Sequence, residues 1–222
     1  MTLAGAVNKS FILLAIVVAS GFFIWNQLYD PVTGYQEIPG WYYGSIALAF
    51  ITSLFIIFKP NMAPLLSPFY AVLEGLSLGV LSLYFESLYS GIVMQAMLGT
   101  VCVFAALLIA YRLKIIKPTE NFKLGVFAAT LGIAFIYLAS FIMHFFNMEM
   151  PYLHESSPMG IVVSLVFVSV ASLNLVLDFD FIERGVLNKA PKHMEWYAAF
   201  GLLITVVWIY VEMLKLIAKS RD

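Results

Sequence analysis

Acidic side chains that interrupt apolar runs are the residues of this chain best suited to chemistry. Asp178, Asp180 and Glu183 fall close together where one long apolar run ends, and Glu74 interrupts another. A carboxylate is costly where hydrocarbon begins, so each of these acids needs water, a partner or a function. Carboxylates held away from bulk water bind protons or cations. The sequence therefore predicts a proton or cation site.

Glu74 is the deepest of these acids. If its apolar run begins between Leu65 and Pro68, a rise of ~1.5 Å per residue places Glu74 roughly 9–14 Å inside the span. An acid at the centre of a span costs about 2.5–3.5 kcal/mol, so Glu74 should face the protein interior. The alternative is a neutral carboxyl group that only hydrogen-bonds a neighbouring helix.

Asp178 follows Pro158 by about six turns of helix, at ~3.6 residues per turn, which places it near the cytoplasmic end of its run. Asn174 lies one turn earlier on the same face and is a plausible hydrogen-bond partner. Asp178 and Glu74 are thus the leading candidates for an ion or proton pathway.

Asp180 and Glu183 have two interpretations. Either they belong to the pathway of Asp178, or they are solvated side chains at a helix end. Asp180 and Arg184 are four residues apart and could pair along a helix. Gly185 is then expected to end that helix.

Two further acids, Glu195 and Glu212, flank the uncharged part of the last apolar run. We expect both at membrane interfaces, with Glu195 as a possible auxiliary of the pathway, like Asn174 and Arg184. The three histidines lack metal-ligand spacing, so no metal site is assigned. Without a nucleophile triad, a phosphate loop or a zinc-protease motif, we expect neither an enzyme nor a cofactor.

Composition defines the class of protein that positions these acids. Of the 222 residues, 62% are hydrophobic and 11% are charged, whereas soluble domains carry about 25% charged residues. The chain is therefore expected to be an integral membrane protein with the lipid bilayer as its main partner. A net charge of -1 argues against nucleic acid. The single Cys102 excludes an intramolecular disulfide.

Seven apolar runs are long enough to span a bilayer, which takes about 20 residues of helix. Unpaired backbone groups are not tolerated in lipid, so we predict a single all-α domain, a bundle of seven transmembrane helices. Small residues favour close helix packing and place spans three, five and six in its interior. The expected spans cover residues 9–29, 41–58, 65–85, 91–111, 122–146, 158–177 and 196–218.

Lysine and arginine residues predict the orientation. Nine of them fall on one side of a seven-span protein, which places the N-terminus in the cytoplasm. Lys215, Lys219 and Arg221 contradict this assignment, because they would lie outside. The nine residues are Lys9, Lys59, Arg112, Lys114, Lys117, Lys123, Arg184, Lys189 and Lys192.

Three segments together resemble the Bax inhibitor-1/YccA-like family. Residues 177–182 (LDFDFI) are similar to the acidic end of its sixth helix. Residues 70–79 (YAVLEGLSLG) resemble the glycine-rich third span of its bacterial members, and 195–201 (EWYAAFG) the start of its last helix. The combination, rather than any one motif, carries the resemblance over nearly the whole chain.

This resemblance implies six helices around a central seventh and a place in a bacterial inner membrane. It also implies a pH-sensitive calcium leak, in which an aspartate at the end of span six shares a proton with one in span seven. Asp178 matches the first aspartate. The second is missing, because the corresponding part of span seven reads Leu203-Ile204-Thr205. Asp180, Glu195 or Glu74 would have to replace it.

Two functions follow from these observations. The first is a cation channel or exchanger, carrying calcium, that closes when Glu74 and Asp178 are neutralised at low pH. The second is a non-conducting interaction protein that modulates a membrane-bound protease or a stress response. A proton-coupled solute transporter is a third class, but the sequence lacks the paired broken helices of such proteins.

Overall fold

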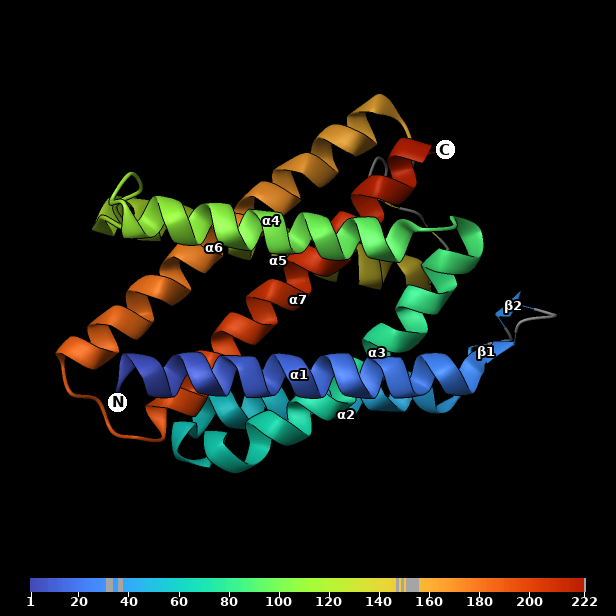
Figure 1. Cartoon of the computed structure of the whole chain (residues 1–222). Coiled ribbons are helices and arrows are strands. Elements are labelled where there is room, and N and C mark those ends of the chain that lie inside the picture. The colour runs from blue at the N-terminus through green and yellow to red at the C-terminus, as the bar shows by residue number, and fades with distance from the viewer. Residues whose placement is uncertain (31–33, 36–37, 147, 149, 151–155, 222) are drawn as a thin grey trace. The chain divides into compact units, whose positions relative to one another are not determined.

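Seven apolar helices make up most of the computed structural model, which describes residues 1–30, 34–35, 38–146, 148, 150 and 156–221. The helices are α1 (Leu3–Leu28), α2 (Trp41–Phe58), α3 (Ala63–Leu88), α4 (Ile92–Arg112), α5 (Glu120–Phe145), α6 (Pro158–Leu187) and α7 (Met194–Arg221) (Figure 1). Each is long and apolar enough to cross a membrane. The all-α, seven-span class is confirmed, and α2 has the predicted bounds.

Two short elements connect the first helices. Strands β1 (Tyr29–Asp30) and β2 (Gly34–Tyr35) form a two-residue antiparallel ladder after α1. The 3-10 turn η1 (Pro60–Met62) leads into α3, as expected of a proline that cannot continue α2. These elements are turns in a helical protein rather than a sheet.

The described chain divides into two compact units. Unit 1 contains residues 1–93 and 181–204, and unit 2 contains 94–180 and 205–222. Helices α6 and α7 therefore contribute residues to both units. The arrangement of six helices around a seventh stays a prediction.

Helix α6 continues ten residues beyond the predicted span, so the prediction that Gly185 ends it is wrong. The helix ends at Leu187, and the turn is closed by Lys189, whose φ of 50° lies in the left-handed region. The amide of Ala190 donates to the carbonyl of Gly185 (2.9 Å). Exposed polar residues such as Glu183 and Arg184 allow the helix to extend past its apolar part.

Close packing of α1 on α3 forms the centre of unit 1. A Cβ added to Gly75 would lie 2.4 Å from the carbonyl oxygen of Val17 and 2.0 Å from Ser20 Oγ. One added to Gly79 would lie 2.7 Å from the carbonyl oxygen of Gly21. The two backbones touch because these positions carry no side chain. This confirms the predicted interior position of span three.

The prediction that span five is also interior is wrong. Half of an 18-residue apolar window of α3 is buried and 44% of those of α6 and α7, but only 11% of that of α5. Gly125 and Gly132 face open space. Small residues permit close packing but do not require it, and α5 buries only a narrow seam with Val126 and Ile133.

In unit 2 this seam of α5 packs against α6. Asn174 on α6 hydrogen-bonds Thr130 on α5. Seven residues earlier on α6, Phe167 stacks on Tyr137, which lies seven residues later on α5. From one contact to the next, the position moves seven residues back along α6 and seven residues forward along α5. The two helices are therefore antiparallel neighbours.

Helix α7 packs on α6 in the same way. Asp178 bonds Thr205. Fourteen residues earlier on α6, Ser164 accepts from Lys219, which lies fourteen residues later on α7. Helices α5, α6 and α7 therefore share one seam in unit 2, and the acids described below lie along it.

The α1–α3 contact predicts that Gly75→Ala destabilises the protein. The added methyl group collides with the backbone of α1, so the helices must separate. We expect a loss of about 1–3 kcal/mol in unfolding free energy, as for other overpacked sites. Gly132→Ala is the control, because its methyl group meets open space and should cost nothing. Denaturant unfolding in detergent measures both, and equal stability of the two variants would contradict the close contact.

Candidate functional site

Asp178 sits on α6 with an incompletely paired carboxyl group. The hydroxyl of Thr205 on α7 hydrogen-bonds it. Its other oxygen, Oδ2, is enclosed and has no hydrogen-bond partner among the described residues. A buried carboxylate held for structure alone normally accepts several donors. The site therefore combines an enclosed acid with a single neutral partner.

Asn174 is not the partner of Asp178, so this prediction is wrong. Its amide nitrogen donates to Thr130 Oγ1 (2.8 Å) and to the carbonyl of Val170 (2.9 Å). Sharing a helical face with Asp178 brings the two residues near each other. Asn174 joins α6 to α5.

Asp180 forms an ion pair with Lys123 of α5, with 2.8 Å between Nζ and Oδ2. Its side chain is 14% exposed, so the interpretation of Asp180 as a solvated helix end is wrong. Glu183, by contrast, is exposed, as predicted, and so is Arg184. The lysine matches the charge of Asp180, which leaves Asp178 as the acid of this helix without a basic partner among its described contacts.

Glu74 is half-buried on α3 in unit 1. Its partner is the hydroxyl of Tyr70, one turn earlier on the same helix. Tyr70 is buried, and its ring stacks edge-on against Phe200 of α7 with centroids 5.0 Å apart. The hydrogen bond within α3 resembles the structural alternative for Glu74, except that the donor lies on its own helix.

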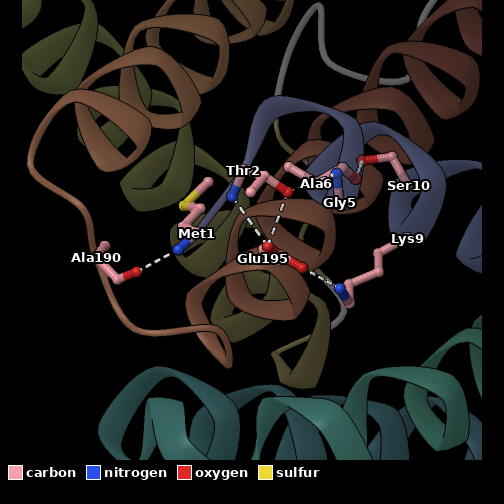
Figure 2. Close-up of polar contacts among 8 residues, drawn as sticks. All are labelled: Met1, Thr2, Gly5, Ala6, Lys9, Ser10, Ala190 and Glu195. Carbon is pink, nitrogen blue, oxygen red and sulfur yellow. Dashed lines mark hydrogen bonds and ion pairs between the residues drawn. The ribbon is translucent and has the colours of Figure 1, made fainter.

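Glu195 is buried at the start of α7, with 2% of the residue exposed. Figure 2 shows its carboxylate facing the first turns of α1. Oε1 accepts from the amide (2.9 Å) and the hydroxyl (3.2 Å) of Thr2, and Oε2 pairs with Lys9. A Cβ at Gly5 would lie 2.4 Å from Oε2, so the carboxylate fits only because residue 5 is glycine.

Neighbouring contacts extend this attachment of α1. The ammonium of Lys9 lies 5.6 Å from the ring centroid of Trp196. The amino nitrogen of Met1 donates to the carbonyl of Ala190 (Figure 2). Ala6 packs with Ile182 and Ala198. These contacts make Glu195 a structural anchor of α1.

Glu212 is also buried within the protein, with 1% of the residue exposed. Its Oε1 accepts from Tyr137 Oη (2.6 Å), Trp208 Nε1 (3.3 Å) and Lys215 Nζ (3.3 Å). Lys219 donates to the carbonyl of Gly160 (3.1 Å) and to Ser164 (2.9 Å).

A periodic signal in the sequence points to this polar network of unit 2. Its α7 members recur every three or four residues, the spacing of one helical face. They are Thr205, Trp208, Glu212, Lys215 and Lys219.

Comparison with known families agrees with this architecture. A family model described as Bax inhibitor 1 like matches residues 1–222. The chain belongs to the Bax inhibitor 1 like family. No curated protein sequence matches it. With seven helices suited to crossing a membrane, this family member is an integral membrane protein.

The structure of this Bax inhibitor 1 like protein also fills the position for which the sequence lacked an acid. The resemblance implies an aspartate in span seven opposite Asp178. In this chain Thr205 hydrogen-bonds Asp178. A hydroxyl group cannot share an acidic proton as a second carboxylate does. Any proton that Asp178 binds therefore belongs to one acid rather than to a pair.

The buried Glu195 predicts a large loss of stability for Glu195→Ala. Removing the carboxylate leaves the Lys9 ammonium, which is 15% exposed, without its counter-charge. We expect about 3–5 kcal/mol, as for other broken buried pairs. The double variant Lys9→Met/Glu195→Ala should lose less than Glu195→Ala alone, because the lone charge is gone.

Glu120→Ala is the matched control for this experiment. Glu120 also pairs with a lysine, Lys123 (3.3 Å), but its side chain is 81% exposed, and exposed pairs contribute little. Unfolding in detergent compares the variants. A Glu195→Ala protein as stable as Glu120→Ala would show that Glu195 does not anchor α1.

Proposed function

We propose that this Bax inhibitor 1 like protein is a pH-sensitive cation leak with calcium as its ion, and that Asp178 is its pH-sensitive acid. The supporting observation is the enclosed Oδ2 of Asp178, which has no hydrogen-bond partner among the described residues. An acid that served only packing would be better paired. An acid that binds and releases a cation or proton needs an oxygen free to do so.

The charge of Asp178 determines the direction of the pH effect. The deprotonated carboxylate attracts a cation, whereas the protonated group carries no charge and loses this attraction. Asp180 does not compensate, because Lys123 matches its charge. Thr205 is neutral over the relevant pH range. The leak is therefore expected to decrease as the pH falls, with the dependence of a single acid.

Glu74 is the second proposed pathway acid, and its support is weaker. Its location in a membrane-spanning helix favours a function, but its bond to Tyr70 supplies a partner. We keep it as a proposed contributor in unit 1. The pathway proposal depends on Asp178.

We also propose that the protein lies in the inner membrane with a cytoplasmic N-terminus. The sequence conflict came from Lys215, Lys219 and Arg221. Lys215 donates to Glu212 and Tyr137, and Lys219 is buried against Gly160 and Ser164. Because Lys215 has partners on α5 and α7 and Lys219 has partners on α6, we do not count them as loop charges. The nine lysines and arginines on the predicted cytoplasmic side support the proposed orientation, whereas Arg221 still opposes it.

Calcium flux into proteoliposomes tests the proposal. Asp178→Asn should carry less flux than the wild type and lose most of its pH dependence, because the amide does not titrate. Asp178→Glu keeps the charge and should retain the dependence. Glu183→Gln, an exposed acid on the same helix, is the matched control and should behave as wild type.

Equal pH-dependent flux in Asp178→Asn and the wild type would refute the role of Asp178. Flux no greater than that of protein-free vesicles at any pH would refute the leak itself. The interaction protein would then be the better explanation. Recovery of a membrane-bound protease with the purified wild type in mild detergent would support that function.

A further inference from the structure

The buried carboxylate of Glu212 has no role in the mechanism above, although it lies on the same seam. We propose that Glu212 is a further cation-binding acid of the leak, in addition to Asp178 and Glu74, and that the Lys215 ammonium occupies its site as a tethered cation. This inference rests on the proposed cation leak. It assigns to Lys215 the regulation of that leak: the protein's own cation must leave before a solute cation can bind.

Position is the first argument. Glu212 follows Thr205 by seven residues, which is two turns of α7 on one face and roughly 10.5 Å along the helix. The contacts Asp178–Thr205 and Ser164–Lys219 lie on either side of it in the α6–α7 seam. Glu212 is thus the α7 acid on the face that carries the partner of Asp178.

The chemistry around Glu212 is the second argument. Its Oε1 accepts from the Tyr137 hydroxyl at 2.6 Å, and that hydroxyl in turn accepts from Lys215 at 3.0 Å. The ammonium also lies 4.6 Å from the centroid of the Tyr137 ring. A carboxylate, a phenol oxygen and an aromatic face together form a position that favours a cation.

Unequal burial is the third argument. The Glu212 side chain is 2% exposed, whereas that of Lys215 is 34% exposed. The long lysine side chain can move its ammonium outward while its stem stays in place. Glu212 cannot follow, so the departure of Lys215 leaves a buried carboxylate that a solute cation can neutralise.

The small number of oxygen ligands at Glu212 indicates how strongly a cation would bind there. Calcium takes about six to eight oxygen ligands in a storage site, and Glu212 with Tyr137 supplies far fewer. An ion here would keep most of its water and bind weakly. Weak binding suits a transient site, because an ion that is conducted must also leave.

Lys219 does not take the place of Lys215. It is buried, and its two hydrogen-bond partners are the carbonyl of Gly160 and the hydroxyl of Ser164. Its charge interacts with those of Glu212 and Lys215, but its hydrogen bonds hold the ammonium at α6.

Substitution of each partner tests the inference, because the expected effects on calcium flux have opposite signs. Lys215→Gln should raise the flux at neutral pH on the order of tenfold, within the usual range of coupling between sites. Glu212→Gln should lower it. The double variant Lys215→Gln/Glu212→Gln should behave like Glu212→Gln. Lys215 acts by occupying the site at the Glu212 carboxylate, so its loss has no effect once that carboxylate is gone.

Two further variants control this experiment. Lys215→Arg keeps a tethered charge and should keep the flux near wild type. Lys192→Gln removes an exposed lysine elsewhere and should have no effect. Lys215→Met is an apolar alternative if the glutamine variant does not fold, and it should raise the flux in the same direction. Gel filtration in detergent verifies that each protein is intact.

The outcomes separate this inference from the proposed function. A purely structural pair would give the same sign from either partner, namely reduced stability and unchanged or reduced flux, and this result would overturn the inference. If Asp178→Asn still abolished the pH dependence, the proposed leak would stand without the tether. If neither the wild type nor Lys215→Gln exceeded protein-free vesicles, both would fail.

Discussion

The cost of placing charge inside apolar helices is the constraint on which the structure depends. Every carboxylate within a span must be matched by the protein, because lipid offers no hydrogen bonds. Five of them are matched here in one of three ways, by the lysine of another helix, by a lysine of the same helix, or by a hydroxyl group. The pairs are Glu195–Lys9, Asp180–Lys123, Glu212–Lys215, Glu74–Tyr70 and Asp178–Thr205.

These partners differ in whether they cancel the charge of the carboxylate. A lysine cancels the charge of its acid and fixes a helix contact, as Lys9 does for α1 at Glu195. A hydroxyl group supplies one hydrogen bond and no charge. Asp178 therefore retains an unmatched ionisable group, while Asp180, only two residues away, does not. Proximity in sequence says little about function when partners lie on other helices.

The sequence predicted the fold well, because its main signal is local. A run of about 20 apolar residues is read without knowledge of other helices, and all seven spans are present. The end of α6 was missed for a local reason. Gly185 favours a helix stop only where a left-handed turn is needed, and Lys189 provides that turn instead. The interior position of span five failed because small residues do not specify which neighbour they meet.

The candidate site was predicted only in part, because its partners are distant in sequence. Lys123 and Asp180 are on different helices, and so are Glu195 and Lys9. The residues adjacent to an acid in the sequence do not indicate which lysine of another helix will pair with it. The polar face of α7 is different, because its spacing of three and four residues is visible in the sequence. The depth of a single acid within a span does not indicate this face, whereas the periodicity of the polar residues on α7 points to Glu212.

Thr205 illustrates how one substitution changes the control of a proton without changing the helix contact. Two opposed carboxylates repel each other and share a proton, so their titration belongs to the pair. A threonine at the same contact still joins α6 to α7, since its hydroxyl bonds Asp178. In the leak proposed above, the proton response is then that of Asp178 alone. A second charged acid on α7, if the leak requires one, must lie at another turn of the same face, and Glu212 occupies such a turn.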